Sequence, residues 1–132
     1  MPNNVYSSFL ELLKTDSVIS PLIADYKGLK SVHAMVQPED SVLMPSLTLN
    51  MENDDILPSK TTEQICLLNV YAANPVQAKY ISRVISGRLD DSKFTVLGVT
   101  MLFICNGLPV LGDSLTKEFN SPLEVRVVYY GD

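Results

Sequence analysis

The sequence is poor in the residues that most metal centres and thiol enzymes need. It contains one histidine, two cysteines and no tryptophan in 132 residues. The spacing of Cys66 and Cys105, with His33 as the single histidine, matches no zinc-ligand pattern, so no metal ion is expected. Both cysteines lie in apolar, strand-like segments, which predicts small buried thiols in a reducing compartment. A disulfide would require that their two strands be neighbours.

Basic charge and long apolar runs are also scarce. Ten Lys and Arg residues stand against fifteen Asp and Glu residues, which gives a net charge of −5. Binding to a nucleic-acid backbone is driven by clustered Lys and Arg, so this balance argues against a general phosphate binder. The longest apolar stretch, 96–105, is shorter than the roughly 20 residues that span a bilayer. The first residues lack the basic and apolar parts of a signal peptide, so we expect no membrane contact.

Catalytic motifs are absent as well. The sequence has neither the glycine-rich phosphate loops nor the G-x-S-x-G motif of hydrolases. A thiol hydrolase would need Cys66 or Cys105 beside His33, but His33 lies in an alternating segment that is typical of a sheet surface. The acidic segment 52–55 has no glycine at a turn and fits no calcium loop. We therefore expect no enzyme activity, no cofactor and no metal.

Helical periodicity predicts two helices and a short helical turn. Residues 4–15 repeat apolar side chains at helical spacing. A short turn follows, with Ser20 as its cap and Pro21 in its first position. Asn74 and Pro75 then open the longest helix, 74–89. Its expected apolar stripe consists of Val76, Tyr80, Ile81, Val84, Ile85 and Leu89, and its expected solvated face of Gln77, Lys79, Ser82, Arg83 and Ser86.

Alternation of apolar and polar residues predicts the strands. They are expected at 31–36, 47–51, 61–73, 94–106 and 123–130, with a possible bulge at Gly98 and a clearly half-exposed strand at 47–51. Helices and antiparallel strands segregated in this way indicate a single α+β domain over residues 1–132. We expect a mainly antiparallel sheet of about five strands, packed by the long helix 74–89 together with the N-terminal helix and the helical turn.

Two long connections, 52–62 and 107–121, are the best candidates for functional contacts. Long loops on a small rigid body usually carry function, and without a catalytic constellation that function is contact with other proteins. Phe119 is a large apolar residue in a polar connection, which fits either a core plug or an interface anchor. The predicted contact residues are Asn53, Asp54, Asp55, Leu57 and Lys60 in the first connection and Leu115, Lys117 and Phe119 in the second.

Two smaller charged features each allow two interpretations. Lys79, Arg83 and Arg88 form a basic strip on the long helix, which either pairs with a neighbouring subunit or keeps that face hydrated. Asp90 and Asp91 fit a turn at the end of this helix better than an acid–base pair.

The order of segments along nearly the whole chain resembles the tail terminators and related neck proteins of long-tailed bacteriophages. The segments are Thr15-Asp16 followed by Leu22-Ile23, then Pro38 and Pro45 before the strand 47–51, then 66–72 (CLLNVYA) leading into the helix 74–89, and finally 123–130 (LEVRVVYY). Two features depart from that family's pattern. The last strand lacks the common tryptophan, and no arginine-rich stretch lies between 106 and 121.

The resemblance implies a structural protein of the virion, assembled in the host cytoplasm, with no catalysis. Such proteins form a ring, typically a homo-hexamer, on the head-proximal end of the tail tube, where they stop tube growth and provide the surface for head docking. The implied partners are further copies of the chain, the tail tube protein and the head–tail connector proteins. DNA would pass through the lumen without specific binding, which the acidic balance favours.

Two other functions stay open. One is a different head–tail neck adaptor of the same virion, which would also be a small ring-forming subunit. The other is a cytoplasmic α+β domain that binds a small molecule, which would need a pocket with converging polar groups.

Overall fold

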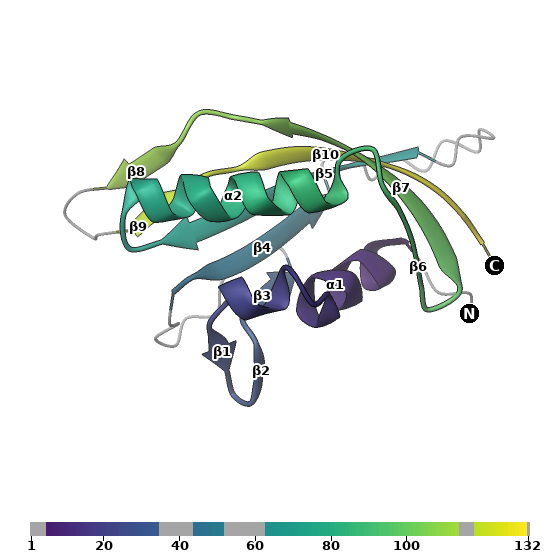
Figure 1. Cartoon of the computed structure of the whole chain (residues 1–132), viewed down its shortest axis with the longest axis horizontal. Coiled ribbons are helices and arrows are strands. Elements are labelled where there is room, and N and C mark those ends of the chain that lie inside the picture. The colour runs from purple at the N-terminus through teal and green to yellow at the C-terminus, as the bar shows by residue number, and fades with distance from the viewer. Residues whose placement is uncertain (1–4, 35–43, 52–62, 114–117, 132) are drawn as a thin grey trace.

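A computed structural model describes residues 5–34, 44–51, 63–113 and 118–131 (Figure 1). Within these residues the chain forms two α-helices, one 3-10 turn and ten strands. In chain order they are α1 (Val5–Thr15), η1 (Ser20–Leu22), β1 (Asp25–Tyr26), β2 (Leu29–Lys30), β3 (Val32–Ala34), β4 (Ser46–Met51), β5 (Glu63–Ala72), α2 (Pro75–Leu89), β6 (Lys93–Val96), β7 (Val99–Gly107), β8 (Leu111–Asp113), β9 (Glu118–Asn120) and β10 (Leu123–Gly131).

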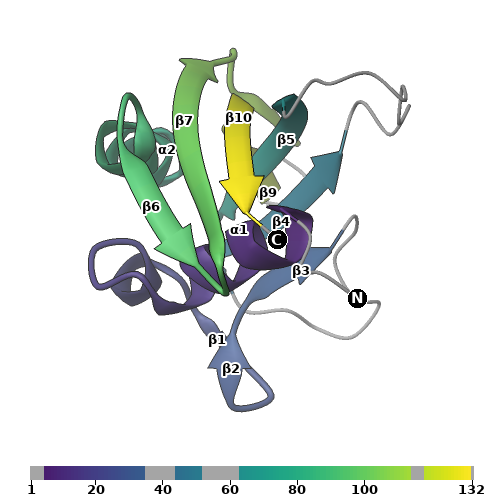
Figure 2. The same ribbon diagram turned by 90° about the vertical axis from the view of Figure 1, so that its right-hand side faces the viewer.

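Eight of the strands form one curled, mixed sheet (Figure 2). Its main order is β3-β4-β5-β10-β7-β6; β9 pairs with β5, and β8 pairs with β9. Strand β3 runs parallel to β4, whereas the other pairs are antiparallel. The expected sheet of about five mainly antiparallel strands packed by one long helix is therefore wrong, although the chain is α+β. Three additional short strands and a parallel edge account for the difference, and α1 packs on the sheet together with α2.

A tight turn divides the segment 94–106, which was expected to be one strand with a bulge. Leu97 and Gly98 both have positive φ, 52° and 82°, so the chain reverses there and β6 pairs with β7. Two successive positive φ values are typical of a type I′ hairpin turn. Because leucine rarely adopts such a φ, the sequence indicates only the glycine. The same device, Lys27 followed by Gly28, joins β1 to β2 in a separate two-stranded sheet.

The helices begin where the sequence predicts. Asn74 caps α2, since its side-chain oxygen accepts a hydrogen bond from the Gln77 backbone N–H at 2.7 Å. Pro75 occupies the first helical position, where its missing N–H has no cost.

One hydrophobic core lies between the two helices and one face of the sheet. Phe9 of α1 and Phe103 of β7 are both fully buried, with ring centroids 4.9 Å apart. Ile81 and Ile85 of α2 join the same cluster. Both helices therefore cover the same face of the curled sheet (Figure 2). None of the described helices has the length and apolarity required to cross a bilayer.

The predicted apolar stripe of α2 is only partly correct. Val76 is 78% exposed and Tyr80 is 59% exposed, whereas Ser82, which was expected to face solvent, is buried. The buried side of the helix consists of Ala78, Ile81, Ser82, Ile85 and Leu89. Small side chains let α2 approach the sheet closely, so packing rather than hydrophobicity decides which side turns inward.

Strand β4 is buried on both faces, although its alternation predicted a half-exposed strand. Leu47 and Leu49 enter the main core, and Ser46 and Thr48 are also buried on the other side. Thr48 accepts a hydrogen bond from Asn69, which satisfies the buried hydroxyl.

Candidate interaction surfaces

Most of the predicted contact residues lie outside the described residues. They are Asn53, Asp54, Asp55, Leu57, Lys60, Leu115 and Lys117. Phe119 is described, and it lies on β9 rather than on an irregular connection, because 107–121 contains the β8–β9 hairpin.

Phe119 packs within its own hairpin. It pairs with Gly112 of β8 on one side and with Ala72 of β5 on the other. A side-chain carbon at Gly112 would lie 2.1 Å from the Phe119 ring, so the ring covers a position that only glycine can occupy. Phe119 is half-buried and is not part of the main core. The core-plug interpretation is therefore wrong, and the interface interpretation stays a prediction.

A chain of side-chain amides fixes this hairpin to the sheet. Asn120 donates to the Asn69 side-chain oxygen at 2.9 Å and accepts a hydrogen bond from the Val70 backbone N–H at 3.1 Å. Asn69 in turn donates to Thr48 at 3.1 Å. Because buried amides are costly unless they are satisfied, this network holds β9 in one register against β5.

The sheet face opposite the helices is one candidate surface. Ile65 pairs with Arg126 of β10, and Arg126 pairs with Ile104 of β7. Side chains alternate between faces, so these three point away from the core. Ile104 is 46% exposed and Tyr130 is 53% exposed. No helix of the described chain lies on this side. Thr48 of β4 is buried on this side, so the name uncovered face is kept for the part on β5, β10 and β7. Its residues are Glu63, Ile65, Leu67, Leu102, Ile104, Glu124, Arg126, Val128 and Tyr130.

Charges on the uncovered face are partly paired. Arg126 Nε lies 3.2 Å from Glu63 Oε1, and both side chains are about half exposed. Such an exposed pair stabilises the fold little, by roughly 0.2–1 kcal/mol. The uncovered face thus combines apolar side chains with charges of both signs, a composition seen in protein contacts.

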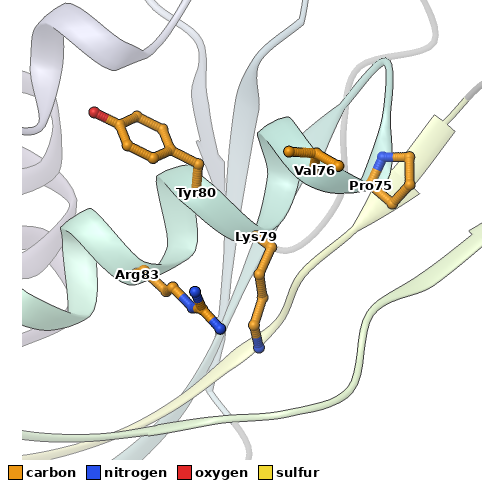
Figure 3. A pocket seen from close by; sticks show the side chains of 5 residues that line it. All are labelled: Pro75, Val76, Lys79, Tyr80 and Arg83. Carbon is orange, nitrogen blue, oxygen red and sulfur yellow. The ribbon is translucent and has the colours of Figure 1, made fainter.

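The outer side of α2 is a second exposed surface. Pro75, Val76, Lys79, Tyr80 and Arg83 line an open depression of about 420 Å³ (Figure 3). Lys79 and Arg83 extend to one side of the helix and Tyr80 to the other (Figure 3). The depression is a groove between side chains on a helix surface, not an enclosed cavity, which does not favour the small-molecule alternative.

Arg88 does not belong to the predicted basic strip. Its guanidinium binds the Asp16 carboxylate, with Nη2 at 2.9 Å from Oδ1, and lies over the Phe94 ring at 5.2 Å. Asp16 also accepts the backbone N–H groups of Val18 and Ile19. Burial opposes ionisation of Asp16, but these hydrogen bonds outweigh it and lower the pKa of the carboxyl. The strip therefore reduces to Lys79 and Arg83, and Arg88 ties α2 to the end of α1.

The structure separates the residues of the thiol-enzyme interpretation. Val125 of β10 pairs with Cys66 on one side and Cys105 on the other, so the thiols are two strand spacings apart, roughly 10 Å. That separation precludes a disulfide, and both cysteines are free. Burial and the nearby Asp90 carboxylate raise the pKa of Cys105 to about 12, which disfavours the reactive thiolate.

His33 is distant from both cysteines. It lies on β3, whereas β4 separates it from the strand of Cys66, and Cys105 is farther across the sheet. Its ring bonds to the Ser31 hydroxyl at 2.7 Å, and burial, with a smaller effect of Lys14, lowers its pKa. No cysteine–histidine pair forms among these residues.

Asp90 and Asp91 form the turn predicted at the end of α2. The Asp90 carboxylate accepts the Cys105 backbone N–H at 2.8 Å, and Asp91 has a φ of 57°. In the ranges that the structure describes, no three His, Cys, Asp or Glu residues are grouped so as to hold a metal ion.

No protein-family model, curated protein or solved structure matches this chain. The functional inference therefore depends on the motifs of the sequence and the surfaces described above.

Proposed function

We propose that the chain is a structural subunit of a bacteriophage neck, a tail terminator that assembles into a ring, with six copies as the expected number. The ring would cap the head-proximal end of the tail tube, end tube polymerisation and present a docking surface for the head. The order of sequence motifs supports this proposal.

The uncovered face is the structural observation that supports it most. A sheet with helices on one side only leaves apolar side chains of the other side in contact with water. Ile104 and Tyr130 are each about half exposed there, and contiguous exposed apolar groups mark contact surfaces. A subunit in a larger assembly would bury this face.

A ring also needs a second, different surface on each subunit. Head-to-tail contacts join two unlike patches, and they close into a ring when the rotation allows it. The β8–β9 hairpin lies at the end of the sheet and exposes Leu111 by 61% (Figure 1). Contact between this hairpin and the uncovered face of the next subunit would satisfy the requirement.

The chemistry of the chain fits a passive channel. With a net charge of −5 on each copy, a ring carries a large negative charge. Such a lumen would repel the DNA phosphates, so DNA would pass without sticking.

Native mass spectrometry of a charged variant tests the proposed ring. We expect a species of about 88 kDa, six times the 14.6 kDa of one chain, alone or after mixing with purified tail tubes. Ile104→Asp places a charged side chain, opposite Arg126, in the proposed contact and should remove this species while leaving the fold intact.

Leu29→Asp provides the matched control. Leu29 is more exposed than Ile104, at 66%, but lies on the separate β1–β2 sheet. This variant should keep the large species. A chain that stays monomeric with tubes present, or an Ile104→Asp variant that still forms the ring, would contradict the proposal.

A further inference from the structure

The outer side of α2 carries oppositely charged ends. Lys79 lies near its start and Arg83 near its middle, and Asp90 and Asp91 follow its last residue. Gly87 lies between the two groups and is exposed. The sequence along this surface is therefore cation, cation, glycine, anion, anion.

These charges have no ion pairs within the described chain. Two other surface pairs do form among the described residues: Lys30 binds Asp25, and Arg126 binds Glu63. Lys79 and Arg83 have no carboxylate within 4.0 Å among the described residues, although Arg88 on the same helix is fully paired. The Asp90 carboxylate accepts one backbone N–H through Oδ1, which leaves its second oxygen for another donor.

Apolar side chains accompany the charges. Val76 and Tyr80 are the most exposed large apolar residues of α2. Together with Arg83, Gly87 and Asp90 they follow a spacing of alternately four and three residues, which is the spacing that packs two helices nearly side by side. No side chain or other element would lie within 4 Å of a side-chain carbon at Gly87, so the space over this position is open to a partner.

We propose that a second copy of this chain docks on this surface, with the two α2 helices antiparallel across a two-fold axis that passes between Arg83 and Gly87. In this arrangement Lys79 and Arg83 of each copy face Asp90 and Asp91 of the other, and each Arg83 extends over the Gly87 of the other copy. The positive half of this surface matches the negative half of a second copy only when the two helices run in opposite directions. This self-complementarity favours a second copy over an unrelated acidic partner. The opposed helix dipoles favour the same orientation.

This contact is distinct from the proposed ring. A two-fold contact uses the same patch twice and closes after two copies, so it cannot by itself build a six-fold ring. It uses neither the uncovered face nor the β8–β9 hairpin, and it does not depend on the proposed function. We infer that it pairs free subunits and keeps Tyr80 from water. One helix pair is a small interface, so the dimer should be weak and concentration-dependent.

Sedimentation equilibrium at low salt over a concentration series tests the pairing. We expect a dimer of about 29 kDa, twice the mass of one chain, which dissociates as salt screens the ion pairs. Lys79→Asp places like charges together twice in the dimer and should raise the dissociation constant about tenfold. Combining it with Asp91→Lys restores opposite charges and should return the constant to within about threefold. Lysine tolerates the positive φ of position 91, as Lys27 does in this chain.

Lys93→Asp is the matched control, because it changes the net charge equally at an exposed residue of β6 outside the surface. It should leave the dimer intact, and thermal unfolding should show all variants folded. No dimer up to about 1 mM would overturn the proposal. A folded charge-swap variant that fails to regain the dimer would overturn it as well. Loss of the 88 kDa species instead of the dimer in Lys79→Asp would place α2 in the ring contact and would also overturn it.

Discussion

The two faces of the sheet are built from the same strands but carry different chemistry. On β7, Phe103 is fully buried against α1, whereas the next residue, Ile104, is 46% exposed on the uncovered face. Both are large and apolar, so hydrophobicity does not distinguish them. The difference is that, within the described residues, helices lie on the side of Phe103 and not on the side of Ile104. A contiguous patch of such exposed apolar side chains is typical of a contact surface.

The comparison is tested most strongly by truncating these neighbouring residues. Phe103→Ala should lower the free energy of unfolding by about 3–5 kcal/mol, because it leaves a cavity between α1, β6 and β7. Ile104→Ala should lower it by less than about 1 kcal/mol, since the side chain is already half in water. Urea unfolding of both monomeric variants measures the difference. Equal losses would show that the uncovered face is packed in the monomer.

Breaking the ion pair that links the two helices should have the next largest effect on the free energy of unfolding. Asp16→Asn removes the charge that binds Arg88 and should destabilise the fold by about 1–2 kcal/mol, because the carboxylate is buried.

The same pair gives the fold a pH dependence. In the folded chain the pKa of Asp16 lies below its ordinary value of 3.8, so its stabilising contribution is present above that value. The contribution is lost as the pH falls through the lower, folded pKa. Unfolding at pH 7 and in this acidic range measures it. Asp16→Asn should lose less stability than the parent as the pH falls, and parallel curves would contradict this account.

The smallest effect is expected on the outer side of α2. Val76→Ser should change the free energy of unfolding by less than about 0.5 kcal/mol, because Val76 is 78% exposed. Ile81→Ser on the buried side of the same helix should cost several times more, since it leaves a polar group in the core. Thermal unfolding of the two variants compares the sides directly. A large loss for Val76→Ser would mean that this side is packed within the monomer.

The sequence predicted elements where local chemistry decides them. Asn74 and Pro75 indicate the start of α2. In the last strand the alternation predicts which side is buried, since Leu123, Val125 and Val127 all lie in the core. Tertiary packing decided the rest. In the sequence Val76 has the pattern of a core residue. In the structure, packing against the sheet buries the side of α2 that carries Ser82 instead.

Two backbone features also could not be predicted from the sequence. Leu97 adopts a positive φ that its side chain disfavours, so a hairpin was taken for one strand. Strand β3 pairs in parallel with β4, and nothing in the sequence between the two strands indicates that pairing. Among the predicted contact residues, Phe119 could be placed, and its packing on Gly112 depends on a cross-strand register that the sequence does not show. The uncovered face was not predicted, although alternation within 63–72 and 123–131 carried the signal.

The length of tail tubes assembled with and without this protein tests the central claim most directly. Purified tube protein of the same phage would be polymerised in both conditions, with Ile104→Asp as the variant deficient in the ring contact, and the tubes measured by electron microscopy. The account predicts shorter tubes with a ring at one end when the parent protein is present, and long uncapped tubes with the variant. Tubes of unchanged length that bear no ring would contradict the assignment as a terminator.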